Sequence, residues 1–130
     1  MSTHVSPPDL ACHNKAVRMP FAALAGELRK LLGAKLVAYI GSVHETRAVR
    51  EWAGGRRAPS SGAVERRLRL AYEVALCIAD ADGPAVAQAW FQGLNPLLDD
   101  VSPARLLRDG DLDEVGPLVV AAERRFLAEG

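Results

Sequence analysis

Large apolar residues recur at helical spacing over most of the chain. Between residues 20 and 33 they lie three or four positions apart: Phe21, Leu24, Leu28 and Leu31. A proline suits the first turn of this helix and a glycine suits its end, which fits Pro at 20 and Gly at 33. Two shorter helices are predicted over residues 34–40 and 44–53, with Val49 and Trp52 facing inward in the second.

The second half of the chain continues the helical pattern. Ser60 or Ser61 can cap a helix over residues 62–80, which is apolar almost all round from Leu70 onward and should therefore be the central buried helix. The sequence Asp82-Gly83-Pro84 opens a further helix. A last amphipathic helix is predicted from its inward positions, which are Leu112, Val115, Leu118 or Val119, Ala122 and Phe126.

Residues 90–107, WFQGLNPLLDDVSPARLL, form the most distinctive segment. An aromatic pair, Trp90-Phe91, ends one helix, and the turns Asn95-Pro96 and Ser102-Pro103 precede the apolar Leu106-Leu107. Asn forms turns through its own backbone and Pro disfavours helix in the residue before it, so two such stops indicate a built corner rather than a loose linker. The aromatic pair is either core or an anchor for a partner protein.

Composition agrees with the periodicity and predicts an all-α fold. Ala and Leu dominate while Ile, Thr, Tyr and Phe are scarce, a balance that favours helices over sheets. Residues 1–18 are polar, lack periodicity and are predicted to be a mobile tail. We expect a helix-turn-helix-like region over residues 19–69, packed onto a C-terminal helical domain over residues 70–130.

The formal net charge of zero hides a strong asymmetry along the sequence. Residues 1–43 carry five basic and two acidic groups, and residues 44–69 carry seven Arg and three Glu. Residues 73–130 instead carry four Arg and eleven acids. Such a division indicates either that the two halves meet different partners or that the protein has an ordinary solvated surface.

The two cysteines do not suggest a disulfide. Cys12 lies in the predicted tail and Cys77 in the apolar helix, and a reduced, cytoplasmic setting fits this usage best. The histidines at 4, 13 and 44 are scattered, without the spacing of a zinc site. No apolar run reaches the length of a membrane span, and the N-terminus does not look like a signal peptide.

The sequence offers no convincing set of catalytic groups. It has no nucleophile elbow and no glycine-rich phosphate loop, so we expect a protein that is not an enzyme and needs neither cofactor nor metal. Asp109-Gly110-Asp111 resembles part of a calcium loop, but the remaining ligand positions are absent and helix capping explains these acids, with Asp113, more simply.

Basic residues around the predicted third helix are the better functional lead. Arg47 and Arg50 share one helix face, and more Arg residues follow in the next loop and helix. If residues 34–53 form a helix-turn-helix, the second helix would enter the major groove of DNA. The candidate DNA-binding residues are His44, Thr46, Arg47, Arg50, Arg56 and Arg57. The alternative is a soluble helix whose Arg residues pair with Glu45, Glu51 and Glu65.

The spacing within the corner resembles a known family. Trp90-Phe91, Asn95-Pro96, Leu98, Pro103 and Leu106-Leu107 are similar to the pattern of the Xre/MbcA/ParS toxin-binding domain, the C-terminal half of type II antitoxins paired with RES-domain toxins. The region 34–60 resembles the Xre-like part of the same antitoxins. Members often carry Gly-Gly where this chain has Asp99-Asp100, which puts the backbone of that turn in question.

The resemblance implies a partner and a mode of action. The partner would be a RES-domain toxin that degrades NAD, and a non-catalytic antitoxin would cover the entrance of its active site. The two proteins would assemble as a larger oligomer, or around an antitoxin homodimer, able to bind operator DNA. The implied toxin-binding residues are Trp90, Phe91, Asn95, Pro96, Leu106, Arg124, Arg125, Phe126 and Gly130. The alternatives are a stand-alone helix-turn-helix transcriptional regulator and a small helical enzyme subunit or scaffold.

Overall fold

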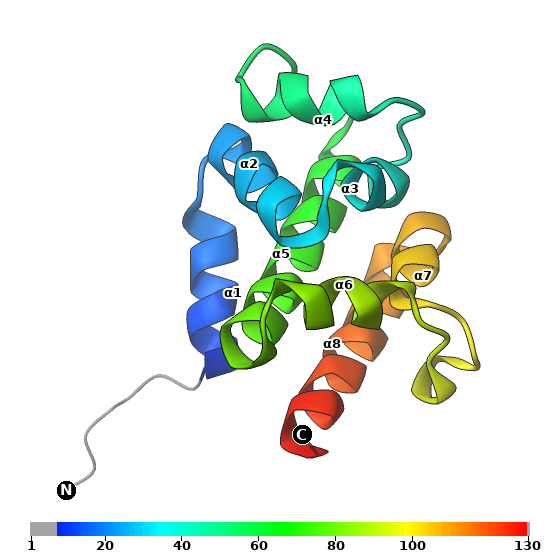
Figure 1. The fold of residues 1–130 in the computed structure, drawn as a ribbon. Coiled ribbons are helices and arrows are strands. Elements are labelled where there is room, and N and C mark those ends of the chain that lie inside the picture. The colour runs from blue at the N-terminus through cyan, green and yellow to red at the C-terminus, as the bar shows by residue number, and fades with distance from the viewer. Residues whose placement is uncertain (1–7, 130) are drawn as a thin grey trace, which may run out of the picture.

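The structure, a computed structural model, describes residues 8–129 and shows helices without a β-strand in that range (Figure 1). This confirms the predicted all-α class. The helices, in chain order, are α1 Pro8–Arg18, α2 Phe21–Leu32, α3 Ala34–Ile40, α4 Thr46–Ala53, α5 Gly62–Asp82, α6 Pro84–Gln92, the 3-10 helix η1 Pro96–Leu98, α7 Pro103–Asp109 and α8 Leu112–Glu129.

Helix α5 is the centre of the molecule, as its apolar sequence predicts. The Ser61 hydroxyl accepts a hydrogen bond from the Val64 N–H and so caps the start of α5, while Gly83, with a φ of 97°, ends it. Helices α1, α2, α6 and α8 all pack against α5, and Figure 1 shows them arranged around it. The remaining helices attach to this assembly, α4 through α2 and α3, and α7 through α3, α6 and α8.

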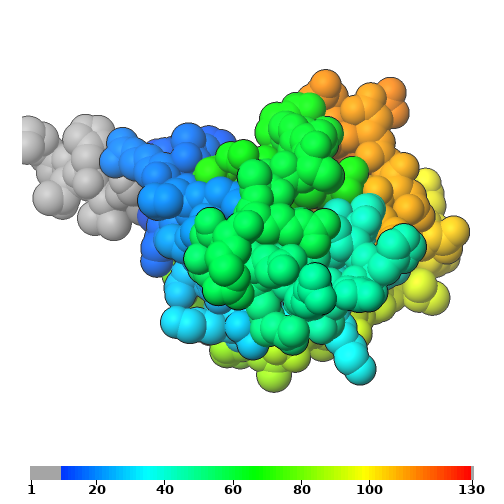
Figure 2. Space-filling view, turned by 90° about the horizontal axis from the view of Figure 1, so that it is seen from above, coloured from blue at the N-terminus to red at the C-terminus, as the bar shows by residue number. Residues whose placement is uncertain are grey.

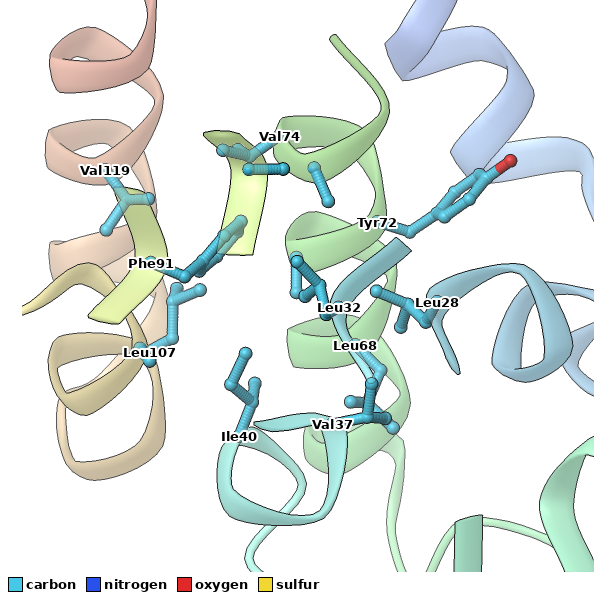
Figure 3. Packing of buried hydrophobic residues seen from close by; sticks show 14 of the residues in the cluster. Leu28, Leu32, Val37, Ile40, Leu68, Tyr72, Val74, Phe91, Leu107 and Val119 are labelled. Carbon is cyan, nitrogen blue, oxygen red and sulfur yellow. The ribbon is translucent and has the colours of Figure 1, made fainter. Parts of the chain in front are cut away.

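One hydrophobic core joins the two predicted domains. Figure 3 shows side chains from several helices meeting around α5, among them Leu28 of α2, Ile40 of α3, Phe91 of α6 and Leu107 of α7. The predicted boundary between residues 69 and 70 falls inside α5, whose residues on both sides belong to this core. A division of labour between the two halves therefore stays a prediction about function.

The N-terminal segment differs from the prediction of a mobile tail over residues 1–18. Residues 8–18 form α1, which packs along α5; residues 1–7 lie outside the described part. The periodicity was missed because the inward side chains of α1 are small. Cys12 and Ala16, four positions apart, are buried, and Arg69 of α5 donates hydrogen bonds to the carbonyl oxygens of Ala16 and Met19.

The prediction that Cys12 and Cys77 do not pair was also wrong. The docking of α1 brings their Cα atoms to 5.9 Å, and the two sulfurs form a disulfide. The error follows from the first one, since a cysteine in a free tail has no fixed neighbour whereas a cysteine on a docked helix does. With the disulfide present, cysteine usage no longer argues for a reducing compartment.

Candidate functional site

The corner between α6 and α7 is organised by Asn95. Its side-chain oxygen accepts a hydrogen bond from the Leu97 N–H at 2.9 Å and caps η1. Its backbone carbonyl accepts bonds from the N–H groups of Leu98 and Asp100, and its own N–H donates to the Val101 carbonyl. These hydrogen bonds of Asn95 give the turn a defined structure, as predicted for a built corner.

The Asp pair in this turn adopts a backbone that L-residues rarely take. Asp99 has a φ of 57° and Asp100 a φ of 61°, both in the left-handed region. Glycine adopts this region without a steric penalty, whereas a side chain costs about 1–2 kcal/mol, somewhat less for Asp and Asn. The presence of Asp where the resembling family often has Gly thus leaves the turn geometry possible but strained.

A groove of about 410 Å³ runs between the corner and the C-terminal half of α8. Trp90 of α6 forms one wall, where its ring lies 5.3 Å from Phe91 and 6.4 Å from Phe126 of α8, measured between ring centroids. Pro96 and Leu97 of η1 form the rim, and Arg125 lies on the side of α8. The result is an apolar surface edged by charge, the composition of a protein-protein anchor site.

The structure brings together five of the nine residues predicted for toxin binding: Trp90, Asn95, Pro96, Arg125 and Phe126. Phe91 is fully buried beneath the groove, and the half-buried Leu106 packs on the core without lining it. Arg124 lies on the opposite face of α8 and lines a different hollow. Gly130 lies outside the described residues.

Two groove residues were not predicted, and both are large apolar side chains that lie mostly exposed. Leu94 is 74% exposed and Leu97 is 55% exposed, while both line the groove. Large apolar residues are rarely so exposed next to other apolar surface unless a partner covers them. The available signal was the presence of two leucines in a turn made of Gly, Asn and Pro, where burial within the chain is difficult.

A second candidate surface lies on α4, at the other end of the molecule. Helices α3 and α4 are joined by residues 41–45 and have the predicted helix-turn-helix order. Val49 and Trp52 are buried, as predicted, and the close approach of Trp52 requires Gly41, since a Cβ there would lie 2.8 Å from the indole ring. Figure 2, seen from above, shows the surface of α4 and its following loop at the centre of this face.

All predicted DNA-binding side chains on this surface are accessible, but half of their charge is paired. His44, Arg47 and Arg57 line one hollow of about 420 Å³, and Thr46 starts α4. Arg47 and Arg57 both reach Glu51, each at 3.4 Å. Arg50 and Arg56 are exposed and have no ion pair within residues 8–129. The structure thus leaves two unpaired cations on this surface.

The following arginines, by contrast, serve the fold. Arg66 contacts Asp113 at 3.6 Å, Arg69 pairs with Glu65, and Arg67 donates to the Ile40 carbonyl at the end of α3. Burial and the nearby Arg108 both lower the pKa of Arg67, while Asp109 opposes them. Arg108 caps the same helix end through the Tyr39 carbonyl and lies over the Tyr39 ring. Arg67 and Arg108 thus join α5 and α7 to the end of α3, whereas the Arg66–Asp113 pair is exposed and links α5 to α8.

Comparison with solved structures identifies a similar protein. A chain from the crystal structure of the Mycobacterium tuberculosis MbcT–MbcA toxin–antitoxin complex superposes with a TM-score of 0.61 and 27% sequence identity, over 80% of this chain and 94% of that chain. The chain resembles the MbcA antitoxin. This match confirms the predicted resemblance to Xre/MbcA/ParS-type antitoxins.

The sequence comparisons found no related protein. No protein-family model matches the chain, and no curated protein matches its sequence. Within residues 8–129, no three His, Cys, Asp or Glu side chains gather as a metal site would require. No helix in that range is long and apolar enough to cross a membrane. The two surfaces described above therefore remain the candidates for function.

Proposed function

We propose that this protein is the antitoxin of a type II toxin–antitoxin pair and that it binds a RES-domain toxin through the groove between α6, η1 and α8. The observation that carries the proposal is the exposure of Leu94 and Leu97 beside Trp90 in that groove. The likeness to MbcA supports the antitoxin role, and the sequence pattern of the corner supports a RES-type partner. The protein would act without catalysis, by covering the entrance of the toxin's active site.

The groove suits this role because its parts are held in place before binding. Asn95 fixes η1, and Phe91 anchors α6 in the core beneath Trp90. A partner that meets a rigid apolar surface loses less conformational entropy on binding than one that must order a loop. Arg125, which is paired with Glu129 at 3.2 Å, edges the groove with charge and can orient an acidic or polar rim of the toxin.

A substitution on the rim tests the proposal without disturbing the core. Leu97→Asp places a charge in the groove, and Leu118→Asp is its matched control, because Leu118 is 53% exposed on α8 and does not line the groove. We expect L118D to protect cells that express the cognate toxin and to copurify with it. L97D should do neither while retaining the helical spectrum of the wild type. Full protection by L97D would refute the groove as the binding site.

Deleting the last helix would be a poor test of the same idea. Val115, Val119 and Ala122 of α8 belong to the core, so removing residues 112–130 would unfold the protein as well as remove the groove. A loss of protection in that truncation would therefore not distinguish binding from folding. The point substitutions separate the two.

DNA binding by α4 is a second candidate function, favoured by the helix order and by Arg50 and Arg56. Both are exposed and have no ion pair in the described part of the chain, and they can neutralise two phosphates. Arg50→Ala combined with Arg56→Ala should weaken retention on upstream DNA and leave toxin binding unchanged. Arg105→Ala is the control, since it removes an exposed cation on α7. A stand-alone regulator would show the same loss of DNA binding in the double variant, but no toxin binding even in the wild type.

A further inference from the structure

Helix α1 packs closely along α5, but it contributes only small side chains to the buried interior. From residue 10 to residue 18, only Cys12 and Ala16 are buried, and Leu10 and Val17 are 45% and 59% exposed. Two small side chains bury little apolar area, so hydrophobic burial alone holds α1 weakly. Its principal packing partner is α5.

Polar contacts add modest support. The His13 ring nitrogen lies 2.8 Å from a Glu73 carboxylate oxygen, and the Arg69 guanidinium bonds to the carbonyls of Ala16 and Met19 at 2.9 and 2.7 Å. His13 is more than half exposed although Glu73 is largely buried, and solvent at the imidazole weakens the attraction between them. The disulfide between Cys12 and Cys77 is thus the strongest link, and it joins positions separated by 65 residues.

A hollow of about 740 Å³ lies directly against this disulfide, between α1, α5 and α8. Both half-cystines line it, each residue with 4% of its surface exposed, so the hollow is the side from which a thiol can reach the sulfurs. Its charged lining is balanced between two cations and two carboxylates: Lys15, Arg124, Asp80 and Glu123. A thiolate entering it therefore meets no excess of negative charge.

We propose that Cys12–Cys77 is a reversible redox site for a dithiol reductant and that its reduction releases α1 from α5. A thiolate of the dithiol attacks one sulfur, forms a mixed disulfide and displaces the other sulfur as a thiolate. The second thiol of the reductant then closes its own disulfide and frees the first cysteine. Two electrons and two protons pass to the protein, which becomes a dithiol. This proposal does not depend on the antitoxin function.

Release of α1 changes a defined surface. A second hollow of about 610 Å³ has His13, Ala16 and Val17 of α1 as one wall, with Leu70 of α5 and Val120 of α8 opposite. Without α1, this hollow and the one beside the disulfide open into a single face of α5. The groove formed by Trp90 and Leu97 lies on the other side of α8 and keeps its lining residues.

Amide hydrogen exchange of the full chain, oxidised or treated with dithiothreitol under native conditions, tests the proposal. Alkylation followed by mass measurement should show two thiols only after treatment. Exchange over residues 10–18 should then rise almost to that of an unstructured peptide, because a short isolated helix is marginal in water. Exchange in α5 and α7 should not change, which would show that the rest of the protein remains folded.

Two variants sharpen the result. Cys12→Ser should show the fast exchange of α1 under both conditions, whereas His13→Ala, which removes the ion pair and keeps the disulfide, should show it only after reduction. The proposal is overturned if dithiothreitol leaves the disulfide intact in the folded protein, or if the cysteines stay free after oxidation. It is equally overturned if both thiols appear and α1 remains protected.

Discussion

The groove on α8 and the basic surface on α4 differ in how many of their exposed groups already have a partner within the chain. On α4, Arg47 and Arg57 share the single carboxylate of Glu51, while Arg50 and Arg56 have no ion pair within residues 8–129. In the groove, Leu94 and Leu97 stay exposed beside Trp90 although the corner around them is rigid. Apolar side chains that stay exposed in a rigid segment indicate a binding partner more strongly than charged side chains that already form ion pairs. The comparison therefore favours binding through the groove.

The largest effect is expected from an acidic residue in the groove. Leu97→Asp should weaken binding to the cognate toxin by about 30-fold or more, the level of an interface hot spot, because a charge would be buried without a partner. Leu118→Asp should change the affinity by less than about threefold, because its site lies outside the groove. Titration calorimetry on the purified pair measures both affinities. Equal losses of affinity in the two variants would show that the groove is not the specific binding site.

The DNA comparison should show a smaller effect. Arg50→Ala together with Arg56→Ala should lower the slope of log affinity against log salt by about two, one for each lost phosphate contact. Arg47→Ala should lower it by less, because Arg47 already pairs with Glu51 at 3.4 Å. Gel retardation at several salt concentrations provides the slopes. If the slope falls more in the Arg47 variant than in the double variant, the ion pairs on α4 do not determine which arginines contact DNA.

Removing the brace of the groove should affect stability and binding together. Asn95→Ala loses the acceptor for the Leu97 N–H and should lower the free energy of unfolding by about 1 kcal/mol, as for other capping residues. Toxin affinity should fall with it, because η1 positions Leu97. Asn95→Asp keeps the acceptor and should behave nearly as the wild type. Urea denaturation and calorimetry give the two quantities, and an unaffected Ala variant would show that the cap is dispensable.

The strained Asp pair should give an increase in stability. Asp100→Gly should raise the free energy of unfolding by roughly 0.5–1 kcal/mol, because glycine relieves the positive φ of 61° at a small entropic cost. Asp109→Gly is the control and should lower it by a similar amount, since Asp109 ends a helix in the ordinary region. A loss of stability in the Asp100 variant would mean that the Asp side chain stabilises the turn.

Tyr72 allows a test of the core far from both surfaces. Its hydroxyl is buried without a hydrogen-bond partner in the described range, and burial, then Glu27 and Asp80, raise its pKa above 10.0. A raised pKa in the folded state means that stability is complete below pH 10 and falls as the pH rises further. Tyr72→Phe should match the wild type or exceed it by up to about 1 kcal/mol, and should not show this alkaline loss.

Helix periodicity predicted most of the fold because large side chains marked the buried faces. The helix over residues 34–40 was placed where the structure has α3, and residues 62–80 were recognised as the central helix. The segment 8–18 was missed because Cys12 and Ala16 are too small to produce a periodic signal. The disulfide depended on that docking and could not be inferred from the spacing of the cysteines.

The candidate site was partly predictable, for a related reason. Trp90 and Pro96 were found through the pattern of the corner, which local turn chemistry explains, and Phe126 through the periodicity of the last helix and the family resemblance. The sequence did not predict that Arg125 lines the groove and Arg124 does not. Neighbouring residues on a helix face different sides, and only packing decides which side forms the groove. Leu94 and Leu97 were overlooked since their significance lies in their exposure.

Side-chain footprinting measures on the unmodified protein whether the toxin covers the groove. Hydroxyl-radical oxidation of Leu94 and Leu97 is compared with that of Leu118 in the free chain and in the purified complex with the cognate toxin. All three leucines are more than half exposed in the free protein. We predict that oxidation of Leu94 and Leu97 falls strongly in the complex while Leu118 reacts as before. Unchanged oxidation of Leu94 and Leu97 in the complex would show that the toxin does not cover the groove.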